Sequence, residues 1–248
     1  MGGEVKIEIV IPSMGRAERV LTKNAISNAK ICVPESQAEL YAEYNPELEI
    51  VTHPDSLKGL TLKRQFIHEK FPNVFMLDDD IDCISRLYTE KGENSKLDKD
   101  EAYDIVQYIG NCAKLAGAYL FGISKEVNPL AYNDMRPLEL SGIINGDIGL
   151  LEGSKLYFHE LAKCCDDYWM CAYNAYIHRY CWIDKRFVAK AKDTFCNTGG
   201  TANLRTIEQE KEDTLFLRKM FGEVINLKGD TKLSKRKHEF MRTLKIPF

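Results

Sequence analysis

Three consecutive carboxylates follow a short apolar run, and they are the feature of the chain that points most directly to chemistry. The run covers residues 74–77, and the carboxylates are Asp78, Asp79 and Asp80. Like charges crowded at the end of a short buried strand repel one another unless a cation lies between them. Carboxylate oxygens are ligands that Mg²⁺ and Mn²⁺ prefer, and these ions often take substrate phosphates as further ligands. The sequence therefore predicts a site for Mg²⁺ or Mn²⁺ at the end of this strand.

Two other uses of an acidic cluster agree less well with the sequence. An EF-hand loop that began at Asp78 would need glycine at its sixth position and glutamate at its twelfth, where this chain has Cys83 and Thr89. A phosphatase that forms an aspartyl phosphate would carry its Asp-x-Asp motif after the first strand, with threonine or valine two places further on. Here three strand–helix units are expected before the motif, and Asp82 occupies that place.

Strands that alternate with helices are expected to position these carboxylates. Apolar runs suited to short strands cover residues 7–11, 31–33, 48–51 and 74–77, and good helix formers cover residues 17–29, 36–44 and 61–70. This alternation predicts an α/β domain with a mainly parallel sheet flanked by helices. Ser36 and Thr61 are expected to cap the last two helices.

The same topology places two loops at one edge of the sheet. Ligands of open parallel sheets bind at the carboxyl ends of the strands. Residues 12–16 and residues 78–80 both follow strands at that edge. We therefore expect two loops that are distant in sequence to face one crevice.

The second half of the chain is expected to be less regular. Asp98 and Glu101 form a capping pair, and apolar residues at helical spacing follow as far as Ala116. Further strands are expected over residues 118–123 and 141–151, the second interrupted by turn-forming residues 145–147, with a loop over 197–201 and a helix over 206–221.

Length and composition allow one large domain and argue against several classes of protein. Of the 248 residues 44% are apolar, but no stretch approaches the roughly 20 apolar residues that span a bilayer, and the N-terminus lacks a secretory pattern. We therefore expect a cytoplasmic protein with no membrane association. The eight cysteines show no disulfide pattern, and Cys165, Cys171, His178 and Cys181 match no structural zinc spacing.

The net charge of −3 hides an asymmetry along the chain. Residues 1–177 carry 18 lysines and arginines against 28 acidic residues (net −10), whereas residues 178–248 carry 16 against 9 (net +7). Clustered positive charge near a metal site favours a polyanionic partner such as a nucleoside diphosphate or a nucleic acid. An ordinary solvated tail has the same composition, so both interpretations stay open.

The first 85 residues resemble the GT-A glycosyltransferases. The resemblance rests on the strand end Ile11-Pro12-Ser13 with Arg16 beyond it, on a helix start at residues 59–64, and on the apolar run followed by Asp-x-Asp. More narrowly, the Pro-Ser-x-Gly-Arg and Leu-Asp-Asp-Asp motifs and the later Asn-Thr-Gly-Gly-Thr resemble the TET/JBP-associated glycosyltransferases of bacteriophages.

This resemblance implies a domain plan and a function. It implies a single GT-A-like domain over residues 1–248, in which residues 1–85 bind the nucleotide sugar and residues 86–248 form the acceptor side with a basic C-terminal segment. It also implies metal-dependent transfer of a sugar from a nucleotide sugar, a UDP-sugar in the first instance, to a hydroxyl acceptor. Members of the narrower family are thought to modify 5-hydroxymethyl pyrimidines in DNA. A phage-encoded member would act in the host cytoplasm, and no protein partner is expected.

The resemblance further implies roles for individual residues. Asp80 and Asp78 would hold the metal, with His238 as a third ligand. The nucleotide-sugar contacts would come from Pro12, Ser13, Gly15, Arg16, Lys63, Arg64, Asp78 and Asp79. If the anomeric centre is inverted, a carboxylate must take the proton of the acceptor hydroxyl, and Asp166 and Asp167 are the candidates. Asp147 is a weaker rival that we interpret as a turn residue.

Two other functions are compatible with the same residues. A nucleotidyltransferase on a related fold would also use metal carboxylates and a nucleotide loop. A non-catalytic nucleic-acid-binding module would keep the carboxylates for structure alone. The aromatic residues between positions 168 and 182 suit either stacking on an extruded base or an ordinary core. A retaining mechanism would require no base, and the residue pattern is compatible with either stereochemistry.

Overall fold

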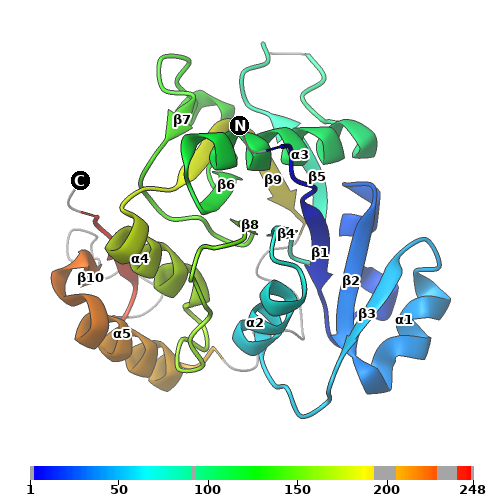
Figure 1. Cartoon of the computed structure of the whole chain (residues 1–248), viewed down its shortest axis with the longest axis horizontal. Helices are drawn as coiled ribbons and strands as arrows, with labels where there is room; N and C mark the ends of the chain where they lie inside the picture. Colours follow the sequence, from blue (N-terminus) through cyan, green and yellow to red (C-terminus); the bar gives the residue numbers. More distant parts are fainter. Residues whose placement is uncertain (1–2, 91–92, 193–204, 228–238, 247–248) are drawn as a thin grey trace.

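A mixed sheet with helices on both faces forms the body of the protein (Figure 1). The computed structural model describes residues 3–90, 93–192, 205–227 and 239–246. The strands of the sheet are β1 (Glu8–Pro12), β2 (Ala29–Pro34), β3 (Glu49–His53), β4 (Val74–Met76), β5 (Ile81–Arg86), β6 (Leu120–Ser124), β7 (Leu138–Glu139), β8 (Ile148–Leu150) and β9 (Trp182–Ala191). The α-helices are α1 (Ala38–Tyr44), α2 (Leu60–Lys70), α3 (Lys99–Ala116), α4 (Asp166–His178) and α5 (Ile207–Phe221). Across these described ranges, no helix combines the length and the apolar character that crossing a bilayer requires.

The strand order explains how the acidic cluster comes to lie near the centre of the sheet. Within the described residues the order is β3-β2-β1-β4-β8-β6-β9-β5, and β7 pairs with β9. The first four strands are parallel, and Ile9 of β1 lies between Ala29 of β2 and Phe75 of β4. β8 runs antiparallel between β4 and β6. The expected α/β fold class is confirmed, with parallel pairing concentrated in the N-terminal half.

Alternate residues of the central strands supply two separate cores. Ile9 and Ile11 belong to the core under α3, whereas Val10 between them belongs to the core under α2 and α4. Successive side chains of a strand point to opposite faces, so a strand that is covered on both faces is apolar at every position. This explains the continuous apolar run before the acidic cluster, in which Phe75 and Met76 lie in opposite cores.

Helix α3 begins and ends where the sequence indicates. The carboxylate of Asp98 accepts hydrogen bonds from the backbone amides of Asp100 and Glu101, and the side chain of Glu101 accepts one from the amide of Asp98. Gly117 ends the helix with φ +77°, a left-handed conformation that glycine adopts without steric cost. The predicted capping pair is confirmed.

The helix expected over residues 17–29 is wrong. The chain there forms two short 3₁₀ turns, Ala17–Arg19 and Thr22–Asn24, and then enters β2. Tertiary hydrogen bonds override helix propensity in this segment, because Thr22 Oγ1 donates to Asp78 O and accepts from the amide of Ile81. The segment is therefore fastened to the acidic loop instead of forming a continuous helix.

The predicted N-caps at Ser36 and Thr61 are also wrong. α1 follows a 3₁₀ turn (Glu35–Gln37), and the hydroxyl of Ser36 donates to Asp55 Oδ1 at 2.7 Å. α2 starts after Gly59, which has φ +90°, and the hydroxyl of Thr61 donates to Ala162 O at 2.7 Å. Both hydroxyls therefore bind residues distant in sequence.

The elements predicted for the second half are confirmed in outline. β6 corresponds to the expected strand at 118–123, and α5 matches the expected helix at 206–221. Of the strand expected at 141–151, only β8 forms, and residues 141–147 before it are irregular, so that part of the prediction is wrong. Thr206 caps α5, since its hydroxyl accepts from the amide of Gln209. The loop at residues 197–201 lies outside the described residues.

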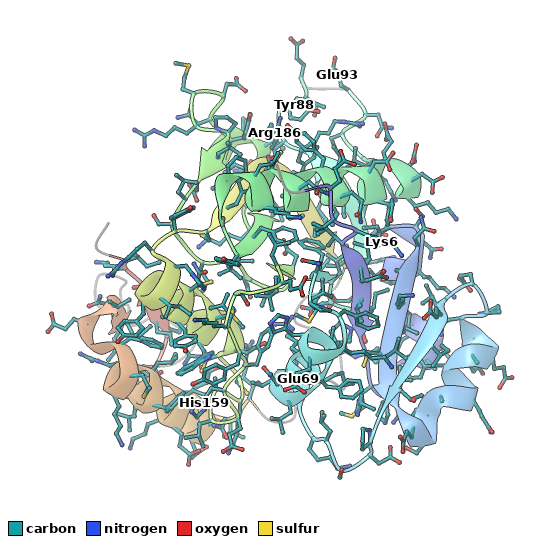
Figure 2. The ribbon with its side chains drawn as sticks, viewed as in Figure 1. Lys6, Glu69, Tyr88, Glu93, His159 and Arg186 are labelled. Atoms are coloured by element: carbon teal, nitrogen blue, oxygen red, sulfur yellow. The ribbon has the colours of Figure 1, made fainter. Side chains whose placement is uncertain are left out.

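A third, smaller core joins α4, α5 and the hairpin of β10 (Ile225–Leu227) and β11 (Arg242–Leu244). Figure 1 shows these elements together, on the side of the molecule opposite β2 and β3. Trp169 is fully buried there and stacks on Tyr173 and Phe216. His159, which Figure 2 labels beside these helices, lies 4.7 Å from the Trp169 ring and 4.8 Å from the Phe216 ring. This core supports α4 from the side away from the sheet.

Gly149 of β8 provides a test of the packing beside the acidic strand. A methyl group added there would overlap the ring of Phe121, which is stacked on Phe75 at 5.7 Å. We expect Gly149→Ala to lower the free energy of unfolding by about 1–3 kcal/mol, the usual cost of overpacking a core. Urea unfolding followed by circular dichroism measures this. Gly3→Ala is the control because its added methyl meets nothing within 4 Å, and equal unfolding midpoints for the two variants would contradict the packing.

Candidate functional site

A cleft of about 1360 Å³ opens at the carboxyl ends of the central strands. Ser13 borders it after β1, Asp78 after β4 and Lys125 after β6. The predicted site residues that line it are Pro12, Ser13, Arg16, Lys63, Arg64, Asp78, Asp79, Asp80, Asp166 and Asp167. Gly15 does not line it, and its amide donates to Gln37 Oε1 at 2.9 Å. His238 lies outside the described residues. The first loop and the acidic cluster therefore do face one crevice.

A buried arginine joins two walls of the cleft. The side chain of Arg64 is only 2% exposed; its Nη1 donates to Asp166 Oδ2 at 2.6 Å, and its Nη2 donates to Asp78 Oδ1 and to Gly146 O, both at 2.9 Å. Burial opposes the charge of Arg64, but the two carboxylates outweigh burial and raise its pKa above the ordinary value. This guanidinium therefore holds the start of α4 against the acidic cluster. The nucleotide contact expected of Arg64 stays a prediction.

Asp79 fastens the first loop to the acidic cluster. Its carboxylate accepts a hydrogen bond from Ser13 Oγ at 2.5 Å and pairs with Arg16 Nη1 at 2.8 Å. Tyr41 of α1 completes this network, since its hydroxyl lies 2.7 Å from Ser13 Oγ and accepts from the amide of Arg16 at 3.0 Å. Asp79 and Asp78 thus engage different partners, as expected of neighbours on an extended backbone.

Two carboxylates of the cluster have oxygens that a cation could use. Among the described residues, no other residue forms a hydrogen bond or an ion pair with the carboxylate of Asp80, and Arg64 uses only Oδ1 of Asp78. Burial raises the pKa of Asp78 to about 6 although Arg64 lowers it, and burial with the charge of Asp79 raises the pKa of Asp80. A nearby cation would offset both effects.

This donor set fits Mg²⁺ or Mn²⁺ bound together with a substrate. Within the part of the chain that the structure describes, no three acidic, histidine or cysteine residues form a complete cage. Mg²⁺ rarely needs one, because it is usually bound through one or two carboxylates, water and substrate phosphates. Asp80 and Asp78 therefore suit the role predicted for them.

Lys63 lies beneath the first loop. It is 4% exposed, and its ammonium group donates a hydrogen bond to Ser13 O. Burial lowers the pKa of Lys63 to about 8, with Cys32 and Asp79 acting in the opposite direction. Lys63 therefore supports the backbone of the loop that was predicted to meet the nucleotide.

The two candidates for a base have different surroundings. Asp166 is 7% exposed, and Arg64 binds one of its oxygens. Asp167 lines the cleft and accepts a hydrogen bond from the amide of Tyr168 at 2.8 Å. Burial and then the adjacent charge of Asp166 raise the pKa of Asp167 to about 6. A carboxylate with this pKa can accept a proton near neutral pH.

Asp147, which the sequence pattern presents as a turn residue, belongs to the cleft. It is 7% exposed, and the amide of Ile123 donates to its Oδ2 at 3.4 Å. Burial raises its pKa well above the ordinary value and so favours the neutral acid. Gly146 makes the turn at φ +83°, and a Cβ there would lie 3.4 Å from Asp78 Oδ2. The only available signal was the Asn-Gly-Asp motif before an apolar strand, which is equally typical of a surface turn.

Charges of both signs line the cleft. Among the described residues, seven cationic residues and six aspartates contribute: Arg16, Lys58, Lys63, Arg64, Lys125, Lys190 and Arg205, with Asp78, Asp79, Asp80, Asp147, Asp166 and Asp167. An anionic ligand that arrives with a divalent cation would complement both sets. Lys190 and Arg205 come from the basic final third of the chain, whereas its most basic stretch, residues 232–238, lies outside the described residues.

The aromatic segment after Asp167 is mainly core. Trp169 is fully buried, Trp182 packs against the core under α3, and Tyr168 lines the cleft. Cys165, Cys171 and Cys181 are buried free thiols, and no metal-binding group forms around them in the described ranges. The core interpretation is therefore correct for both tryptophans.

The fold and the site are those of an α/β protein whose cleft is lined by charges of both signs, and comparison with known sequences gives its class. The family model for TET-associated glycosyltransferases matches residues 7–200. The chain belongs to this family, and it is therefore a glycosyltransferase. A search of curated protein sequences found no significant match.

Solved structures of TarS from S. aureus are also similar. One TarS structure has a TM-score of 0.48 and 13% sequence identity, covering 93% of this chain and 41% of that one. The structure of TarS 1-349 gives a TM-score of 0.45 and 13% identity, and its complex with UDP gives 0.44 and 12%. Both cover 93% of this chain and 77% of the TarS fragment. The present chain thus spans less than half of the longer TarS chain.

Removing the buried guanidinium should destabilise the fold in a pH-dependent way. We expect Arg64→Met to lower the free energy of unfolding by at least about 3 kcal/mol at pH 8, because two carboxylates lose their buried counter-ion. The pKa of Asp78, already raised to about 6, should rise further. Since a raised carboxylate pKa costs stability above that pKa, the loss should shrink as pH falls to 5. Urea unfolding at several pH values measures it.

Arg86→Met is the matched control for this variant. Arg86 pairs with Glu101 at 2.8 Å, but the two side chains are 25% and 46% exposed. An exposed pair contributes less than about 1 kcal/mol, so this variant should unfold almost as the wild type does. Similar losses for the two variants would argue against the central role of Arg64.

Proposed function

We propose that the protein transfers the sugar of a UDP-sugar to the hydroxyl group of a 5-hydroxymethyl pyrimidine in DNA, with Mg²⁺ or Mn²⁺ bound at the acidic cluster. Family membership supplies the reaction class. The observation that carries the proposal is that one cleft holds the first loop, the acidic cluster and Asp167, with Arg64 joining its walls. The DNA acceptor is supported by the resemblance to the phage enzymes and by the cationic lining of the cleft.

The donor site is proposed at the first loop and the acidic cluster. Asp80 and the second oxygen of Asp78 would hold the metal ion, which supplies positive charge to the diphosphate when it is bound. Arg16 lies at the same loop and keeps its guanidinium beside Asp79. Ser13 and Lys63 fix the shape of the loop. The donor diphosphate would therefore meet a preformed polar surface.

Asp167 is the proposed base. It would take the proton of the acceptor hydroxyl while that oxygen forms a bond to the anomeric carbon. The bond between this carbon and the diphosphate oxygen breaks, and the electron pair leaves with the diphosphate. The reaction inverts the anomeric centre. Asp166, which Arg64 binds, would instead fix the start of α4.

The metal assignment predicts the behaviour of Asp80→Asn. In calorimetry with Mn²⁺, we expect this variant to bind UDP more than about tenfold more weakly than the wild type, because a direct ligand should matter at least as much as the outer-shell groups of other metal sites. Asp82→Asn is the control, since Asp82 is exposed on β5, two residues away. If the wild type, Asp80→Asn and Asp82→Asn bind UDP equally in the presence of Mn²⁺, the metal role of Asp80 is excluded.

The base assignment predicts a difference between two neighbouring variants. With a UDP-sugar and an oligonucleotide containing 5-hydroxymethylcytosine, we expect Asp167→Asn to lower kcat by about 100-fold or more while the fold stays intact. Asp166→Asn should also lower stability, because it leaves Arg64 partly unpaired. In the wild type, kcat/KM should fall as pH drops through about 6, where Asp167 takes up a proton.

The same assays separate the alternative functions. Release of pyrophosphate from nucleoside triphosphates would indicate a nucleotidyltransferase. DNA binding without any turnover of a nucleotide sugar would indicate a binding module. Unchanged kcat in Asp167→Asn would remove the proposed base and leave the donor site to be judged by calorimetry alone.

A further inference from the structure

Side chains far along the chain hold Cys164, in the segment that leads into α4 and its first two residues, Asp166 and Asp167. The amide of Cys164 donates to Asp213 Oδ2 of α5 at 2.8 Å, and Cys164 O accepts from Arg242 Nη2 of β11 at 3.3 Å. Asp213 is fully buried and Arg242 is 6% exposed. The backbone amide and the carbonyl oxygen of Cys164 are therefore both bound from behind the cleft wall.

Arg242 connects this segment to α5. Its Nη1 donates to Glu210 Oε2 at 2.8 Å and to Thr214 Oγ1 at 2.9 Å. Its guanidinium lies 5.1 Å from the centre of the Tyr168 ring, and the Tyr168 hydroxyl donates to Arg242 O at 2.9 Å. Arg242 thus contacts the residues on both sides of the aspartate pair, Cys164 before it and Tyr168 after it.

We propose that Arg242 is a positioning residue for sugar transfer, which holds the segment leading into α4 from behind the cleft wall and so fixes the position of Asp167. The proposal rests on the role of Asp167 proposed above. Arg242 lies outside residues 7–200, the range of the family match, so this support comes from a segment that the match does not contain. The C-terminal hairpin thereby becomes part of the catalytic apparatus.

The charges around Asp167 define what loss of Arg242 should do. Burial raises the pKa of Asp167 most and Asp166 adds to the rise, whereas the amide of Tyr168 and, after it, the charges of Arg242 of β11 and Arg64 of α2 lower it. Lys125, which follows β6, also interacts with Asp167 across the cleft. Without Arg242, the opposing charge is smaller and the pKa of Asp167 should rise.

The tyrosine and cysteine neighbours of Asp167 do not change charge in the same range, whereas Asp78, in the same cleft, has a pKa that burial raises to about 6. Burial raises the pKa of Tyr168 to about 12, and it also raises the pKa values of Cys165 and Cys171. All three are neutral near pH 6. Changes in the acid limb of the pH profile therefore report on the aspartates.

Three variants test the proposal. Arg242→Met removes both the charge and the hydrogen bonds, and we expect kcat to fall about 100-fold, with little change in KM for the donor and the acid limb of kcat/KM moved to higher pH. Arg242→Lys keeps the charge but lacks the planar fork, so kcat should fall while the acid limb stays at its wild-type position. Lys245→Met is the control, because Lys245 is exposed and lies directly after β11. It should leave kcat and the acid limb of kcat/KM unchanged.

A measurement independent of turnover accompanies these assays. Carbon-13 NMR titration of aspartate-labelled protein, with the Asp167 signal assigned through Asp167→Asn, should show a higher Asp167 pKa in Arg242→Met than in the wild type. A folded Arg242→Met protein with wild-type kcat and wild-type Asp167 pKa would overturn the proposal. If Arg242→Met does not fold, wild-type kcat in Arg242→Lys overturns it. Absence of sugar transfer by the wild type would refute the proposed function, while the NMR shift would still decide whether Arg242 acts on Asp167.

Discussion

The ion pairs of buried Arg64 with Asp78 and Asp166 determine the geometry of the cleft. The sheet supplies Asp78 at the end of β4, and α4 supplies Asp166 from a part of the chain about ninety residues later. Asp166 is buried whereas the side chain of Asp78 is 42% exposed, and two carboxylates that meet at one group repel one another. The guanidinium of Arg64 has two nitrogens that face in different directions. It offsets this repulsion and sets the separation of the two carboxylates. The positions of the acidic cluster and of Asp167 relative to each other follow from this contact.

The parts of the fold that depend on local signals could be predicted from the sequence. Buried strands have apolar residues at every position, and the capping pair Asp98 and Glu101 marks the start of α3 by its own hydrogen bonds. Errors occurred where tertiary contacts determine the conformation. Thr22 and Thr61 have ordinary local propensities, but their hydroxyls bind Asp78 O and Ala162 O. Such partners have no signature in a single sequence.

In the candidate site, too, local sequence signals predict some features and tertiary contacts determine the others. The spacing of Asp78, Asp79 and Asp80 after an apolar strand predicts that carboxylates meet the first loop, because strand ends share one edge of the sheet. Which partner each carboxylate takes depends on side-chain packing. Asp147 shows this: its position in the cleft and its burial follow from the packing of the chain around it, and residue type alone does not indicate them. The metal, the acceptor and the base stay predictions, since their tests require ligands and turnover.

Two buried arginines flank the aspartate pair, and their placement explains how one wall of the cleft can carry adjacent carboxylates. Arg64 binds Asp166 from the side of the sheet, and Arg242 holds Cys164, which lies just before α4, from the side of α5. Burial and then the charge of Asp166 raise the pKa of Asp167 to about 6, while the amide of Tyr168 and, after it, the charges of Arg242 and Arg64 limit the rise. A direct ion pair would lower the pKa further and make the carboxylate a weak base. Charges that are near Asp167 without pairing with it therefore leave it able to accept a proton at neutral pH.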